Sequence, residues 1–210
     1  MGNQIESLNS NSEQRSAPRV SLMLRSAKLI GPAGEFLCIL RDVSATGIKA
    51  KLFHPLPAGG PLELELGNGE RFAVEPVWLA DGHVGCRFIN GPVELAALVE
   101  EHDKFPKRQI RIKLDLPVIV GGGQSNLAGN LLDLSQHGAL VKLDFFLALG
   151  QLVTVSGSNL PQRHARVRWR RGSAHGLVFH EGFKLDELAR LVAELQSVST
   201  SSENPLRVNH

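Results

Sequence analysis

Residues 41–50 have the sequence RDVSATGIKA, and residues 132–141 have the sequence LDLSQHGALV. Each stretch contains the hexad D-x-S-x-x-G, and the two hexads lie 91 residues apart. The hexad residues are Asp42, Ser44 and Gly47 in the first stretch and Asp133, Ser135 and Gly138 in the second. A motif that recurs at a fixed spacing indicates that one structural unit occurs twice.

The same spacing continues beyond the hexads without a gap. It relates Trp78 to Trp169, Gly85 to Gly176 and Phe88 to Phe179. We therefore expect two domains of one kind, at residues 15–103 and 104–198. The polar segments 1–14 and 199–210 are predicted to be disordered tails.

Each repeat has the pattern of short antiparallel strands. Leu62, Leu64 and Leu66 alternate with glutamates before the turn Gly67–Gly69, which is typical of a hairpin. Residues 164–172 also alternate, which predicts one apolar face and one basic face; the apolar face is Ala165, Val167 and Trp169, and the basic face is Arg166, Arg168 and Arg170. The glycine run at 121–123 lacks the lysine of a phosphate loop and is predicted to be a turn.

Each repeat ends in a segment with helical character. Residues 91–103 form the first, and residues 184–198 form the second, with apolar residues at helical spacing. The predicted fold class is all-β with short helices: two tandem small antiparallel barrels, each followed by a C-terminal helix.

Composition excludes several classes of protein. The 23 basic and 21 acidic residues are too evenly balanced for general binding of a nucleic acid polymer. The sequence has only two cysteines, Cys38 and Cys86, so one disulfide is possible but a scaffold held together by several disulfides is excluded. The apolar runs are too short to span a membrane, and the N-terminus lacks the apolar core of a secretion signal. The chain begins Met-Gly, as a myristoylation signal does, but Glu6 stands where that signal requires serine or threonine. We expect a cytoplasmic protein without membrane attachment.

Upstream of the first hexad, Arg15 and Arg19 form an R-x-x-x-R motif, which we call the arm. An arm followed by the hexad, a small barrel with a strand tryptophan, and a trailing helix resembles the bacterial PilZ domain. The resemblance covers nearly all of residues 15–198 as two copies, and implies a split-barrel fold. It also implies a sensor of the second messenger cyclic di-GMP that is not an enzyme and needs no cofactor.

The resemblance implies a role for each motif residue of the first copy. Arg15 and Arg19 would hold bases and phosphates, because the guanidinium fork can bond guanine or phosphate and stack on a base. Asp42 would accept from guanine N–H groups, Ser44 would add a hydroxyl, and Gly47 would shape the turn. Arg41 is a further candidate for a phosphate contact.

The second copy departs from the pattern in its arm. Lys107 stands where the first arginine belongs, while Arg111 keeps the second. Lysine lacks the planar fork, although Arg108 is adjacent and a shift of one residue would let it replace the missing arginine. The hexad Asp133, Ser135 and Gly138 is intact, so we expect weaker or absent binding here.

Plainer interpretations stand beside these. Taken alone, R-x-x-x-R in a polar tail is commonly a solvated charge pair, and D-x-S at a strand start is commonly a turn cap. The basic face together with Arg171 is commonly a solvated surface, but it could also hold an acidic partner or extra phosphates.

Two rival functions remain. A ligand-independent adaptor would keep the barrels and act only through a protein partner, which the sequence does not identify. An enzyme would need a base, nucleophile or metal cluster. The eight histidines show no metal-ligand spacing, and nothing places a base beside Ser44. The sequence therefore favours a receptor that signals by ordering its arm on a ligand and by protein contact.

Overall fold

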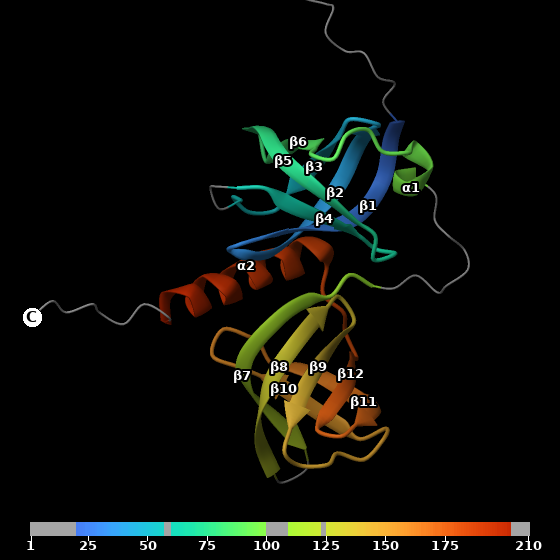
Figure 1. The fold of residues 1–210 in the computed structure, drawn as a ribbon. Coiled ribbons are helices and arrows are strands. Elements are labelled where there is room, and N and C mark those ends of the chain that lie inside the picture. Colours follow the sequence, from blue (N-terminus) through green and yellow to red (C-terminus); the bar gives the residue numbers. More distant parts are fainter. Residues whose placement is uncertain (1–19, 57–59, 100–108, 123–124, 203–210) are drawn as a thin grey trace, which may run out of the picture.

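The computed structural model describes residues 20–56, 60–99, 109–122 and 125–202, which form two barrels and two helices (Figure 1). Four residues of the predicted site lie outside these ranges: Arg15, Arg19, Lys107 and Arg108. The predicted tail at 1–14 lies outside them as well.

The first six strands close into barrel 1, in the order β1-β2-β3-β6-β5-β4 with β4 paired back to β1. All pairs are antiparallel. The strands are β1 (Val20–Gly31), β2 (Gly34–Ser44), β3 (Gly47–Leu52), β4 (Leu62–Leu66), β5 (Arg71–Ala80) and β6 (His83–Phe88).

The next six strands close into barrel 2 with the same topology, β10-β11-β12-β9-β8-β7. The strands are β7 (Ile112–Gly122), β8 (Ser125–Ser135), β9 (Gly138–Leu143), β10 (Leu152–Ser156), β11 (Arg163–Arg171) and β12 (Ala174–Phe179). The predicted fold class, two tandem antiparallel barrels, is confirmed.

The predicted turns join paired strands. Gly69 has a φ of 90° between β4 and β5, a conformation that favours glycine, and its N–H donates to the Leu66 carbonyl at 2.9 Å. Gly122 pairs with Ser125, so the chain reverses at the glycine run of β7. Turn residues therefore set these strand ends.

A β-bulge makes one prediction wrong. Ala165 and Val167 point into the barrel as expected, but Trp169 is 43% exposed. The β11–β12 register shifts between Val167 and Trp169, and the extra residue reverses the phase of the alternation. Trp78 follows a matching shift in β5 and is 44% exposed. Both tryptophans thus lie on the outer surface.

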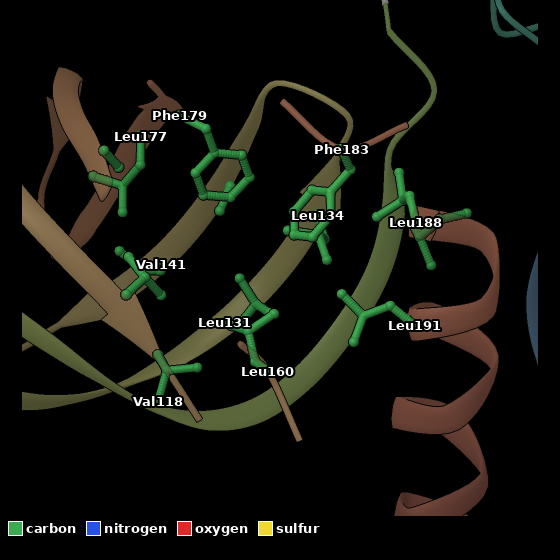
Figure 2. Packing of buried hydrophobic residues seen from close by; sticks show 14 of the residues in the cluster. Val118, Leu131, Leu134, Val141, Leu160, Leu177, Phe179, Phe183, Leu188 and Leu191 are labelled. Atoms are coloured by element: carbon green, nitrogen blue, oxygen red, sulfur yellow. The ribbon is translucent and has the colours of Figure 1, made fainter. Parts of the chain in front are cut away.

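A helix follows each barrel, as predicted. In α1 (Leu95–Val99), Leu98 is fully buried in the core of barrel 1. In α2 (Leu185–Ser202), Leu188 and Leu191 point into barrel 2 among residues from several strands (Figure 2). The helix continues to Ser202, four residues into the predicted tail, because no glycine or proline interrupts 199–202.

The barrels meet at a joint that contains a buried ion pair. Lys28 Nζ in β1 lies 2.9 Å from Glu35 Oε2 in β2 and donates to the Arg111 carbonyl at 3.0 Å. The same Glu35 oxygen accepts from the Lys113 N–H at 2.9 Å. Gln196 of α2, which lies between the barrels in Figure 1, bonds both backbone polar groups of Glu35. Barrel 1 thereby holds the start of β7 directly.

Candidate functional site

Each hexad builds a tight turn between two neighbouring strands, β2–β3 in barrel 1 and β8–β9 in barrel 2. The Gly47 N–H donates to Ser44 Oγ at 3.2 Å, and Ser135 Oγ donates to the Gly138 carbonyl at 3.0 Å. Both serines are buried, at 7% and 1% exposure. The serines therefore act as turn caps, as the plainer interpretation expects.

The hexad glycines allow two strands to approach closely. A Cβ on Gly47 would lie 2.3 Å from the Cys86 carbonyl oxygen, and a Cβ on Gly138 would lie 2.3 Å from that of Leu177. Any larger residue would push β3 from β6, or β9 from β12. This is a structural requirement of the barrel, whatever the turn binds.

A hollow of about 230 Å³ lies beside the first hexad on the outer surface of barrel 1. The half-buried Asp42 lines it on one side. Trp78, Lys49 and Arg87 add an aromatic ring and two cations, and Arg87 also bonds Glu75. The full lining is Asp42, Val43, Ser44, Thr46, Gly47, Ile48, Lys49, Val77, Trp78, Gly85, Cys86 and Arg87.

The tryptophan of this hollow packs on a glycine. A Cβ on Gly85 would lie 2.0 Å from Trp78 Nε1, so only glycine lets the indole lie against β6. Trp169 and Gly176 repeat the arrangement, with a distance of 2.1 Å. In the sequence, these four residues align the repeats, and the tryptophans also contribute to the family resemblance, but neither use places them in the site. Because a tryptophan and a glycine recur on adjacent strands in both repeats, the sequence could have been used to predict that the ring lies on the surface beside the hexad.

In barrel 2, the arm and the hexad meet. Arg111 Nη1 donates to Asp133 Oδ1 at 2.6 Å. The Arg111 side chain is 48% exposed, whereas that of Asp133 is 16% exposed. The pair joins residues 22 positions apart, so two sequence motifs converge at one place on the surface.

Strand register makes the two arms equivalent. Arg19 and Arg111 are 92 residues apart, one more than the hexads. The extra residue lies in the β1 bulge. From Ser21 to Arg25, β1 advances four residues while its partner β2 advances two, whereas the corresponding bulge of β7 advances three residues against two in β8. Val20 and Ile112, which follow the two arginines, consequently pair with equivalent residues of β2 and β8.

The surroundings of the second hexad are less basic. At the 91-residue spacing, Lys49 corresponds to Leu140 and Arg87 to Val178. Arg168, at the position of Val77, supplies one cation in exchange. Arg41, the other candidate contact in barrel 1, is half-buried in the bulge between Leu40 and Asp42.

Both cysteines are buried and free, and Cys86 lines the hollow from below. Burial raises the pKa of the Cys86 thiol to about 11. The pKa of the Cys38 thiol is also raised, mainly by burial and to a smaller extent by the neighbouring Cys86. Neutral thiols are poor nucleophiles and poor metal ligands, so these residues belong to the core.

Among the described residues, no group of three histidines, cysteines or carboxylates is placed to hold a metal ion. None of the helices in the same part of the chain is both long and apolar enough to cross a bilayer.

Comparison with known proteins identifies the domains. Residues 13–102 and 106–196 each match the family model of the PilZ domain. No curated protein sequence matches the chain.

Solved structures resemble the chain at low sequence identity. PlzA of Borreliella burgdorferi, solved in complex with c-di-GMP, is 13% identical with a TM-score of 0.33, over 80% of this chain and 87% of that one. The Bacillus subtilis inhibitor of motility, MotI/DgrA, is 13% identical with a TM-score of 0.33, over 89% and 100%. Escherichia coli YcgR in complex with c-di-GMP is 15% identical with a TM-score of 0.27, over 86% and 84%.

Proposed function

We propose that this chain, which belongs to the PilZ domain family, is a non-enzymatic receptor for cyclic di-GMP. One observation carries the proposal: the Arg111–Asp133 pair joins the arm to the hexad at one place on the surface. Two motifs that are separate in sequence thus form one polar site, with a cation and a carboxylate side by side. The solved relatives PlzA and YcgR were both obtained in complex with c-di-GMP, which supports the choice of ligand.

The chemistry of the barrel 1 hollow suits a guanine nucleotide. Asp42 would accept from the guanine N–H groups, with the Ser44 hydroxyl beside it. Trp78 would stack on a base, and Lys49 and Arg87 would face phosphates. Arg15 and Arg19 would close over the ligand from the arm and add two planar forks to the one that Arg87 supplies.

In barrel 2, the ligand would have to share or replace an ion pair that already exists. Lys107 and Arg108 would supply charge beside Arg111, and Asp133 and Ser135 would face the base. The Arg111 carbonyl is bonded to Lys28 of barrel 1. A ligand that moves Arg111 would therefore act on the joint between the barrels, and a partner would sense that change by protein contact.

Calorimetry of wild type, Arg19→Ala and Arg111→Ala with cyclic di-GMP tests the proposal, with cyclic di-AMP as the control ligand. Removing one charged clamp costs about 1.5–3 kcal/mol, roughly 10–150-fold in affinity. We expect Arg19→Ala to abolish or strongly weaken the tighter site. If Arg111→Ala also loses part of the wild-type binding of cyclic di-GMP, both barrels bind the ligand.

Two results decide against parts of this scheme. Unchanged binding in Arg19→Ala rules out the arm as a clamp. No heat in wild type rules out the receptor and leaves a ligand-independent adaptor.

A further inference from the structure

One face of barrel 1 receives barrel 2. Three of its residues contact barrel 2, and a fourth, Glu65, pairs with one of these three. Lys28 donates to the Arg111 carbonyl, and Glu65 lies 3.2 Å from Lys28 Nζ. Leu37 belongs to the apolar core of barrel 2, and Phe53 packs against that core. We call these four residues the dock of barrel 1.

The repeat places four residues of barrel 2 at the same positions. They are Ile119, Ala128, Asp144 and Ser156, each 91 residues after its counterpart in the dock. The strand register agrees, because Lys28 pairs with Leu37 and Ile119 pairs with Ala128. All four line a hollow of about 760 Å³. The counterpart of the dock is thus an open surface, which we call the distal face.

The distal face continues into an exposed apolar pair. Phe145 and Phe146 follow Asp144 in the β9–β10 loop and are 60% and 75% exposed. At the same positions in barrel 1, His54 and Pro55 line the gap beside α2. The β7–β8 end of barrel 2 points away from barrel 1 (Figure 1). Adjoining exposed aromatic side chains are typical of interaction surfaces.

Arginines flank the apolar pair on one side. The Arg170 guanidinium lies 5.1 Å from the centre of the Phe146 ring and donates to the Leu147 carbonyl at 3.2 Å. Arg166 donates to the Gly150 carbonyl at 3.1 Å. Neither forms an ion pair with a carboxylate in the described part of the chain. This side of the surface is therefore positive and suits an acidic partner.

The hollow itself carries mixed charge. Asp115 and Asp144 line it together with Lys142. The net positive character is thus confined to the arginine side of Phe146. A partner would have to place its acidic residues on that edge, with apolar residues toward Phe145 and Phe146.

We propose that the distal face docks an amphipathic helix with one acidic edge, supplied by a partner protein. A helix is the occupant because α2 lies beside the dock of barrel 1: it lines a gap together with Phe53, and its Gln196 bonds the backbone of Glu35, two residues before Leu37. A second copy cannot supply its α2, because Leu188 and Leu195 are buried in its own barrel 2. The inference gives a place and a chemistry to the protein contact in the proposed function, without depending on cyclic di-GMP.

The probe is a fluorescent synthetic peptide with the sequence of residues 184–198, an amphipathic segment with three acidic and two basic residues. Its binding to the full chain is measured by fluorescence anisotropy. We expect Phe145→Ser/Phe146→Ser to weaken binding at least tenfold and Arg170→Glu to weaken it severalfold. Ile89→Ser, which changes an exposed apolar residue of barrel 1 (46% exposed), serves as the matched control and should bind as wild type does.

Three results would overturn the proposal: no peptide binding, equal binding by the double variant, or self-association of the chain that depends on Phe145 and Phe146. Vesicles of phosphatidylcholine with and without phosphatidylglycerol test the remaining occupant. Binding to the anionic vesicles through the phenylalanines, with no peptide binding, assigns the surface to a membrane instead. Circular dichroism checks that each variant is folded.

Calorimetry with cyclic di-GMP on the same variants separates the two proposals. The double variant should keep the wild-type affinity for cyclic di-GMP, since its substitutions lie away from both hexads. A variant that loses peptide binding but still binds cyclic di-GMP as wild type does tests the distal-face proposal alone. Absence of ligand heat in wild type concerns only the receptor function.

Discussion

Lys28 and Ile119 occupy the same place in the two barrels, yet their surroundings are opposite. Lys28 is 3% exposed and paired with two glutamates, whereas Ile119 is 43% exposed and lines a hollow. Lys28 is buried where its own barrel supplies two carboxylates and the neighbouring barrel supplies the Arg111 carbonyl, and Ile119 is exposed where no described segment covers it. The difference shows that the two copies share a fold but use the same face for different contacts.

The hexad surfaces diverge in the same manner. Barrel 1 places Lys49 and Arg87 around its hollow, and barrel 2 has Leu140 and Val178 at these positions. The residues that build the turn are kept, because Gly47 and Gly138 are each needed for a close approach of strands. The serine and glycine of the hexad are therefore required by the barrel, whereas the hexad aspartate and the residues around the turn determine what ligand fits there.

Substitution at the paired positions should have the largest effect. Lys28→Ala leaves Glu35 buried without its cation, and breaking a buried pair costs about 3–5 kcal/mol. Ile119→Ala, at the exposed counterpart, should change the free energy of unfolding by only about 0.5 kcal/mol. Chemical denaturation of the two variants measures both values. Equal destabilisation would contradict the different roles of the two faces.

The tryptophans offer the next comparison. Trp78→Ala should weaken cyclic di-GMP binding by about 1–3 kcal/mol, because a base would lose its stacking partner. Trp169→Ala in barrel 2 should have a smaller effect on the total binding, since the second hexad has fewer cations near it. Calorimetry on each variant gives the two losses. A larger loss in Trp169→Ala would make barrel 2 the principal site.

The sequence predicted the barrels because alternation and turn glycines are local signals. It also predicted the core face of α2, where Leu188 and Leu191 recur at helical spacing. It did not predict the joint, since the contact of Lys28 with Arg111 spans 83 positions and no pattern marks a buried charge. It placed Trp169 on the wrong face, because the bulge that reverses the alternation has no distinct signature in the sequence.

For the candidate site, the sequence identified the arm and hexad motifs, and the structure identified the side chains that surround them. Arg111 and Asp133 were predicted to share a site, and their ion pair brings the two motifs together in barrel 2. Trp78 and Arg87 were missed, because they line the hollow from β5 and β6, far from the hexad in sequence. Lys49 lies two residues after the hexad and was missed because its place in the hollow is apparent only in the folded barrel. Only strand pairing brings such residues together.

Alkaline pH should weaken barrel 1 in particular, since Cys86 corresponds to Leu177 in barrel 2. Burial raises the pKa of the Cys86 thiol from 9.0 to about 11, so the folded state keeps a proton that the unfolded state loses. This contribution is complete below pH 9 and is lost as the pH rises toward 11, by about 1 kcal/mol at pH 10. Thermal unfolding of wild type and Cys86→Leu at pH 8 and pH 10 measures it. The wild type should lose more stability than the variant, and equal losses would contradict this assignment.

A similarly small effect tests the arm of the second copy. Lys107→Arg restores R-x-x-x-R, and the added fork can form a hydrogen bond that an ammonium group cannot orient in the same way. One such bond contributes about 0.5–1.5 kcal/mol, so we expect the affinity of barrel 2 to rise roughly 2–10-fold. Lys107→Met is the control and should lower it, because it removes the charge. Measuring both in an Arg19→Ala background isolates barrel 2 from barrel 1. If Lys107→Arg changes nothing while Arg108→Ala abolishes binding, Arg108 already serves as the first clamp, and the shift of one residue in the arm is what keeps the second copy functional.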